Sequence, residues 1–329
     1  MGPASAFVGS GNKSKEASKR PASIDAFSRP LSDFGSEREA DKADQNEILP
    51  SPTTAVEALQ TWRNPRINML RLAAAFTSFI VLGANDAALG ALIPYLETYY
   101  SLTYTIVSLA FLSPLAGYTA SALLSSVIHL KLGQRGVAFI GPLSHILAYL
   151  VTSFHPPFPA IVVVFAIAGF GSGLQDAAWN AWVGGMANSN EIMGILHGFY
   201  GLGAVIAPLV ATTMITRAHL PWYYYYYVML GIAIAEFALS VFAFWRATAA
   251  EYRKANPRTT DAKGNRMTEA LFRRPSARVT WVTTFFLVCY MGVEVALGGW
   301  ITVFMLNVRR GTPFASGMVT TGFWLGMTL

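Results

Sequence analysis

The sequence has little charge and almost no cysteine. Charged residues make up 13% of its 329 positions and hydrophobic residues 53%. The mean hydropathy is +0.41, a balance that excludes an ordinary soluble domain. The single cysteine, Cys289, excludes a disulfide framework and a metal site built from several cysteines within the chain. We interpret it as a small buried hydrophobic residue. The scarcity of charge predicts a membrane protein.

The basic surplus does not indicate a nucleic-acid partner. The formal net charge is +6 at pH 7, but the lysines and arginines stand between long apolar runs and form no single dense patch. We therefore predict no nucleic-acid binding and look for function in the apolar part of the chain.

Long apolar runs fill most of the chain after residue 66. Each is about 20 residues long, enough for a helix to cross a hydrocarbon core of roughly 30 Å. Seven such runs lie near residues 70–94, 105–128, 136–154, 160–186, 192–215, 222–245 and 279–306, and an eighth begins near Phe314. This pattern predicts an all-α membrane protein.

The distribution of basic residues between the runs predicts the orientation of the chain. By the positive-inside rule, the more basic connections and the N-terminus are cytoplasmic. The opposite connections carry Arg217, Arg309 and Arg310. We expect a multi-pass protein in the plasma membrane rather than in an internal membrane. The basic set comprises Arg63, Arg66, Arg71, Lys131, Arg135 and nine lysines and arginines from Arg246 to Arg278.

Composition divides the chain into four parts. Residues 1–66 are rich in Ser, Lys, Glu, Asp and Pro and lack an apolar period, which predicts a disordered cytosolic tail. Residues 67–246 form a six-span bundle and residues 247–278 a basic cytoplasmic linker. Residues 279–329 form a partial second half, with the seventh span and the start of an eighth. This order indicates a protein built from two halves.

The first run contains an aspartate far from either end. In "GANDAALG", residues 83–90, Asn85 and Asp86 stand about 20 Å into the helix, at 1.5 Å per residue. A charge at that depth costs several kcal/mol unless it is paired, neutralised or facing water. An apolar setting favours the protonated carboxyl, so Asp86 is a candidate for proton transfer. The alternative is a structural carboxylate satisfied by neighbouring helices.

A second group of candidates lies in the fourth run. Asp176 and Asn180 share one helical face with several glycines, which permit a neighbouring helix to approach closely. Gln175 adds a neutral hydrogen-bonding group. Trp179 and Trp182 flank the polar face, where they stack on a sugar ring or serve as packing residues.

Two further ionisable residues lie in the fifth and sixth runs. His197 relays protons or only hydrogen-bonds across helices, and the sequence leaves both interpretations open. Glu236 is a weaker candidate because nothing around it in sequence resembles a polar face.

A weak internal repeat relates the first and seventh runs. Asp86-Ala-Ala-Leu-Gly90 matches Glu294-Val-Ala-Leu-Gly298 at an offset of 208. Thr103 matches Thr312, and "LAGYT" at 115–119 matches "WLGMT" at 324–328, at an offset of 209. Parallel repeats of six spans are the build of one large transporter fold, which places the solute site at the repeat interface near mid-membrane. The two carboxylates are then pseudo-equivalent.

These residues resemble the major facilitator superfamily, and within it the fucose–proton symporter type and the fungal bypass-of-stop-codon-like branch. The resemblance covers residues 67–329. It rests on Asn85-Asp86, "GSGLQDAAWNAW" in the fourth run, "LHGFYGLGAVIAP" in the fifth and "GVEVALGGW" in the seventh. It implies that carboxylates of spans one and four lie in a central cavity and serve solute recognition and proton coupling. In this sequence those positions are Asp86 and Asp176.

The sequence departs from that family in two ways. The loop between spans two and three, "SSVIHLKLGQRG", keeps the gating-loop residues Lys131, Gly133 and Arg135 but lacks the usual Asp. A full transporter of this type has twelve spans, whereas this chain stops at Leu329 within the eighth. We therefore expect a truncated chain with a complete six-helix N-terminal half and one to two helices of the second half.

The leading hypothesis is a secondary transporter, not an enzyme, that moves a small polar solute such as a sugar by proton-coupled alternating access. It needs a solute, a lipid bilayer and protons as the coupling ion, with no other cofactor and no metal, and we expect a monomer. A drug or organic-cation antiporter of the same fold is the first alternative, because Gly203 to Pro208 keep the spacing of its span-five signature. A non-transporting truncated remnant is another.

Two classes outside transport fit less well. A seven-span receptor has an extracellular N-terminus, against the charge bias, and does not account for the repeat. An intramembrane aspartyl protease needs a Gly-x-Gly-Asp arrangement, which "GSGLQD" does not provide.

Overall fold

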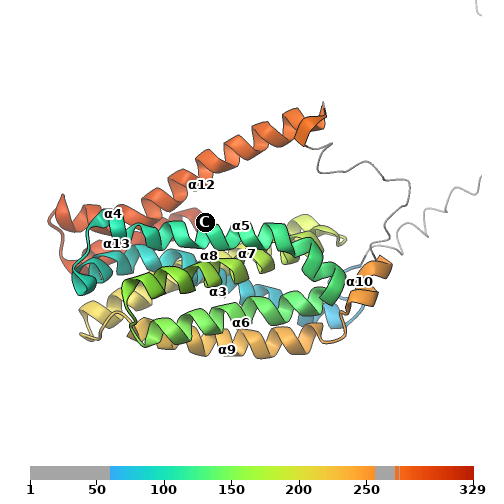
Figure 1. Ribbon diagram of the computed structural model, residues 1–329, viewed down its shortest axis with the longest axis horizontal. Helices are drawn as coiled ribbons and strands as arrows, with labels where there is room; N and C mark the ends of the chain where they lie inside the picture. The colour runs from blue at the N-terminus through green and yellow to red at the C-terminus, as the bar shows by residue number, and fades with distance from the viewer. Residues whose placement is uncertain (1–59, 256–270, 274) are drawn as a thin grey trace, which may run out of the picture. The chain divides into compact units, whose positions relative to one another are not determined.

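A computed structural model describes residues 60–255, 271–273 and 275–329 (Figure 1). The predicted tail up to residue 59 and half of the predicted linker, 256–270 and 274, lie outside the described residues. Gln60 and Thr61, expected within the tail, contact the helices: the Gln60 carbonyl accepts from the Ala187 backbone N–H at 2.9 Å, and the Thr61 carbonyl accepts from Asn68 Nδ2 at 2.9 Å.

The apolar runs form helices with bounds close to those predicted. Among the described residues, seven stretches are long and apolar enough to cross a membrane, counting α4 and α5 as one. An all-α membrane protein is therefore confirmed. The helices are α3 (Ile67–Tyr100), α4 (Tyr104–Val107), α5 (Leu109–Leu132), α6 (Gln134–Ser153), α7 (Phe158–Gly184), α8 (Ser189–Thr216), α9 (Tyr224–Phe244), α10 (Ala249–Ala255), α12 (Ser276–Asn307) and α13 (Pro313–Thr328).

Glycines bring two pairs of helices into close contact, as the small-residue face of the fourth run predicted. Gly169 of α7 lies against the backbone of Pro114, and Gly117 of α5 lies against the Ala166 carbonyl. A second reciprocal pair joins α3 and α8 through Gly83 and Gly203. Without side chains at these positions the backbones approach closely and gain dispersion contacts, which drive helix association where water is absent.

The first and seventh spans also meet at a glycine. Gly90 of α3 lies directly against the backbone of Gly298 in α12, so the two glycines matched by the sequence repeat touch each other. This contact fixes the second-half helix against the first half one turn beyond Asp86 and Glu294.

The predicted gating-loop residues surround the turn between α5 and α6: Lys131 lies in the last turn of α5, Gly133 between the helices and Arg135 in the first turn of α6. Gly133 has a φ of 72°, a conformation that glycine adopts without strain, and it lies against the backbone of Thr248. The Arg135 backbone N–H donates to the Ala247 carbonyl at 2.9 Å. The loop is thus held against the chain that follows α9. We call this end of the bundle, which also carries α10 and the first turn of α3, the linker end.

Burial of Cys289 is a prediction that the structure corrects. Cys289 is exposed on α12, because most side chains of α12 before Gly298 are exposed and the helix is covered mainly from Gly298 onward. Figure 1 shows α12 leaving the other helices toward its N-terminal end.

Candidate functional site

Two cavities meet inside the bundle and share part of their lining. One cavity, of about 500 Å³, is lined by Asp176 in addition to the shared residues, and we call it the Asp176 compartment. The other, of about 390 Å³, reaches Asn85, and we call it the Asn85 compartment. The shared wall is formed by Asp86, Tyr118, Tyr200, Met291, Glu294 and Trp324. Helices α3, α5, α8, α12 and α13 thus contribute to one site.

Asp86 has a hydrogen-bond donor on each carboxylate oxygen. Asn85 Nδ2 donates to Oδ1 at 3.1 Å, and the Tyr200 hydroxyl donates to Oδ2 at 3.1 Å. The Tyr149 hydroxyl in turn donates to Asn85 Oδ1 at 3.1 Å. These neutral donors orient the carboxylate without cancelling its charge, so Asp86 can still take a proton or accept from a solute hydroxyl.

Asp176 lies in the other compartment and has its own amide partner. Asn180 Nδ2 donates to Asp176 Oδ1 at 2.8 Å and to the Asp176 carbonyl at 3.0 Å. Asn180 does not itself line either compartment, so it acts on the site by holding the Asp176 carboxylate in place.

His197 lines the Asp176 compartment at an exposed position. Its Nδ1 lies 3.0 Å from the Met193 carbonyl. A carbonyl only accepts, so Nδ1 carries the hydrogen and Nε2 is the nitrogen that can bind a further proton. Because Met193 belongs to the same helix, this contact is not a hydrogen bond between helices.

Glu294 lines both compartments, as Asp86 does. The two residues matched by the sequence repeat therefore face the same space from opposite halves, while their matched glycines are in contact. The structure brings together Asp86, Asn85, Asp176, Glu294 and His197.

The structure places Gln175 and the two tryptophans elsewhere, which corrects their assignment to the solute site. Gln175 is fully buried and packs against Gly141 of α6. Trp179 is fully buried and stacks on Phe244 with ring centroids 4.4 Å apart. At 100° per residue, Trp182 lies about 120° around the helix from Asp176. It meets the edge of Phe244 at 5.6 Å.

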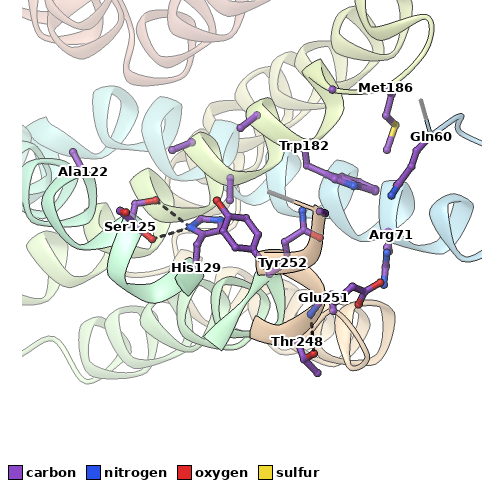
Figure 2. Close-up of a pocket in the computed structure, with 18 residues that line it drawn as sticks. Gln60, Arg71, Ala122, Ser125, His129, Trp182, Met186, Thr248, Glu251 and Tyr252 are labelled. Carbon is purple, nitrogen blue, oxygen red and sulfur yellow. Dashed lines mark hydrogen bonds between the residues drawn. The ribbon is translucent and has the colours of Figure 1, made fainter. Parts of the chain in front are cut away.

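Trp182 instead lines a third cavity, of about 610 Å³, at the linker end (Figure 2). This cavity shares no lining residue with the two compartments. Figure 2 shows Arg71 of α3 and Glu251 of α10 pointing toward each other across it. His129 Nδ1 lies 2.8 Å from the Ser125 carbonyl. The cavity lies between α10 and the other helices, and Asp86, Asp176 and Glu294 do not line it.

Sequence reasoning missed the partner of Glu236. Glu236 Oε2 lies 3.1 Å from His145 Nδ1, and both side chains are fully buried. The sequence around Glu236 resembles no polar face, and its partner lies on another helix, α6. The signal that would have found the pair is a histidine in the middle of the third apolar run, opposite a glutamate in the middle of the sixth. Tyr118, Tyr200 and Trp324 of the shared wall were likewise not singled out as site residues.

Comparison with known proteins gives matches over most of the chain. Residues 74–329 match the Major Facilitator Superfamily. The chain is 26% identical over 280 residues to "Bypass of stop codon protein 6" of Saccharomyces cerevisiae, covering 79% of this chain and 55% of that protein. It is 22% identical over 259 residues to "Glucose/mannose transporter GlcP" of Bacillus subtilis, covering 77% of this chain and 62% of that protein.

Among solved structures, the chain is similar to the peptide transporter POT in complex with alafosfalin. The TM-score is 0.47 and the identity 19%, over 73% of this chain and 52% of that chain. The chain thus spans between half and two thirds of the length of the proteins it matches.

Proposed function

Because this chain belongs to the Major Facilitator Superfamily, we propose that it is part of a secondary transporter that moves a small polar solute, a sugar, by proton-coupled alternating access. The family and the relatives point to a transporter and not to an enzyme. The sugar is supported by the likeness to a protein named a glucose/mannose transporter.

One observation carries the proposal: two compartments meet at a wall formed by Asp86 and Glu294. A solute in this space is reached by a carboxylate from each half of the protein. Interfaces between repeats are where transporters of this build bind their solutes. A shift of one half against the other then changes both sets of contacts at once.

The contacts of α12 support alternating access. Near its C-terminal end α12 is joined to the first half: Asn307 Nδ2 donates to the Tyr104 hydroxyl at 2.6 Å, and the Trp300 ring lies 5.7 Å from the Tyr104 ring. Toward the linker end the side chains of α12 are exposed. In the described residues α12 is thus joined to the first half at the end opposite the linker, and its side chains toward the linker end are exposed.

The roles of the site residues follow from their partners. Asp86 binds the coupling proton or a solute hydroxyl between its two donors, Asn85 and Tyr200. Asp176, held by Asn180, is the second carboxylate, and His197 passes protons through its Nε2. Glu294 completes the site from the second half.

The orientation follows from the sequence. The linker end carries the basic connections, so we propose that it and the N-terminus are cytoplasmic, that the membrane is the plasma membrane and that the transporter works as a monomer.

The test is uptake of radiolabelled D-glucose and D-mannose by proteoliposomes holding the full reading frame, with and without an inward proton gradient. We expect Asp86→Asn to abolish gradient-driven accumulation while solute exchange between the two sides continues. The matched control is Glu191→Gln, an exposed carboxylate that lines neither compartment. Accumulation by Asp86→Asn equal to that by the control would refute the coupling role.

A second candidate, an organic-cation antiporter, is favoured by the charge of the lining. The described residues that line the two compartments include three carboxylates, several aromatic rings and no lysine or arginine. Such a lining attracts a cation through charge and through the faces of aromatic rings. Proton-driven export of ethidium, with no uptake of either sugar, would select this function over sugar symport.

A further inference from the structure

A buried ionisable pair lies behind the Asn85 compartment, in the interior of the first six helices. His145 of α6 and Glu236 of α9 are both fully buried and 3.1 Å apart. His145 Nε2 lies 3.1 Å from Ser172 Oγ of α7. Three helices are therefore joined through one imidazole ring, and neither residue lines the solute compartments.

The contact between His145 Nδ1 and Glu236 Oε2 needs one hydrogen, which either atom can carry. A net charge sealed in a low-dielectric interior is strongly unfavourable, and Glu236 Oε1 has no hydrogen-bond partner among the described residues. The neutral combinations are imidazolium with carboxylate and imidazole with carboxylic acid. Each supplies one hydrogen to the contact between Nδ1 and Oε2.

The imidazole ring is packed against a tyrosine that reaches the solute site. Tyr149 lies one turn further along α6, and its ring is stacked on His145 with centroids 5.8 Å apart and planes 11° apart. The Tyr149 hydroxyl donates to Asn85 Oδ1. Because the amide oxygen of Asn85 is taken, its nitrogen faces Asp86 and donates to Oδ1.

The pair acts on Asp86 by orienting the side chains between them and not by transferring a proton. Both nitrogens of His145 are taken, by Glu236 and Ser172, so the histidine touches Tyr149 only through its ring face. The ring of Tyr226 on α9 also faces Tyr149, with ring centroids 6.1 Å apart. The Tyr225 hydroxyl donates to the Ala84 carbonyl at 3.3 Å.

We infer that His145 and Glu236 are positioning residues for Asp86. They fix the plane of the Tyr149 ring, and the Tyr149 hydroxyl fixes the orientation of the Asn85 amide. The amide in turn determines the direction in which the free lone pairs of the Asp86 carboxylate point. The inference rests on the proposed function only for what Asp86 binds; the positioning itself is a property of the protein without solute.

Glutamine and leucine at position 236 separate positioning from proton transfer. In Glu236→Gln the side-chain oxygen still accepts from His145, and no shared proton is needed. In Glu236→Leu the hydrogen bond is lost and Nδ1 is left buried without a partner, which is unfavourable. Positioning predicts that glutamine substitutes for glutamate and that leucine does not.

The measurement is the infrared carboxyl stretch of Asp86 in the full-length protein at acid pH, without solute, identified by its disappearance in Asp86→Asn. We expect Tyr149→Phe and Glu236→Leu to shift this band to higher wavenumber by a similar amount, because the carboxyl loses the donor that the Asn85 amide provides. We expect no shift in Glu236→Gln. The matched control is Ser144→Ala, a buried neighbour whose hydroxyl donates within its own helix.

Two results would overturn the inference. One is an unshifted band in Tyr149→Phe, a change that keeps the ring stack and is the least disruptive to folding. The other is an equal shift in Glu236→Gln and Glu236→Leu. Since no solute is present, both results are independent of the sugar uptake experiment, so failure of one proposal is distinguishable from failure of the other.

Discussion

The contact between Gly90 and Gly298 makes a quantitative prediction about the conformation of the transporter. A Cβ atom added at Gly90 would lie 3.0 Å from the carbonyl carbon of Gly298 and 3.2 Å from Cα of Gly299, with the Gly298 oxygen closer still. Carbon atoms in contact prefer roughly 3.5–4.0 Å. The clash with the Gly298 oxygen is the closest of the three, so in Gly90→Ala α12 must move away from α3 by more than about 1 Å.

This movement destabilises the conformation in which Gly90 and Gly298 are in contact. Overpacking of this kind typically costs about 1–3 kcal/mol, and it acts where the two glycines touch, one turn from Asp86 and Glu294 on the side opposite the linker. A difference of that size changes the ratio of two conformations by roughly 5- to 150-fold. We expect Gly90→Ala to populate a state open at the end opposite the linker.

Labelling of a cysteine inside the site measures the opening. The exposed Cys289 is first replaced by serine, and Ala110→Cys is introduced at a fully buried position in the lining of the Asn85 compartment. A membrane-impermeant maleimide added from the end opposite the linker should then react faster in Gly90→Ala, within the range above. The control is Gly231→Ala, where a Cβ meets no atom within 4 Å. Equal labelling rates in the two variants would refute the reasoning.

Two further predictions concern stability and solute binding. Gly133→Ala should lower the stability of the purified protein by roughly 1–3 kcal/mol, because a φ of 72° disfavours a side chain and the Thr248 backbone occupies the space that a Cβ would need. Thermal unfolding in detergent measures this, and an unchanged unfolding midpoint would contradict it. Trp179→Ala should lower stability by about 3–5 kcal/mol and leave the affinity for D-glucose unchanged, whereas Trp324→Phe at the shared wall should change that affinity. Equilibrium binding and unfolding measurements on both variants separate the two roles. Weakened D-glucose binding in Trp179→Ala would show that Trp179 belongs to the solute site.

Much of the fold could be predicted from the sequence. The hydropathy of 20 consecutive residues decides whether a segment forms a membrane helix, and for that reason the predicted run 192–215 and the observed helix Ser189–Thr216 nearly coincide. Four short motifs predicted the superfamily, which residues 74–329 confirm. The narrower likeness to fucose–proton symporters stays a prediction.

Part of the site could also be predicted. The depth of Asp86 in its run and its match with Glu294 placed both residues in one cavity system, since a carboxylate at mid-membrane must face the interior of the bundle. The faces of α7 were harder to predict. Asp176, Trp179 and Trp182 are close in sequence, but only the first lines a solute compartment.

The sequence alone determined which segments are helices and where the charges cannot face lipid, and it predicted that Asp86 and Glu294 are equivalent residues of the two halves. These are properties of single segments and of their comparison. The tertiary structure decided which faces meet: it paired His145 with Glu236 across 91 positions, turned Trp179 toward Phe244 and set Gly90 against Gly298. The physical reason is that the rotation of each helix about its axis is fixed by packing against its neighbours.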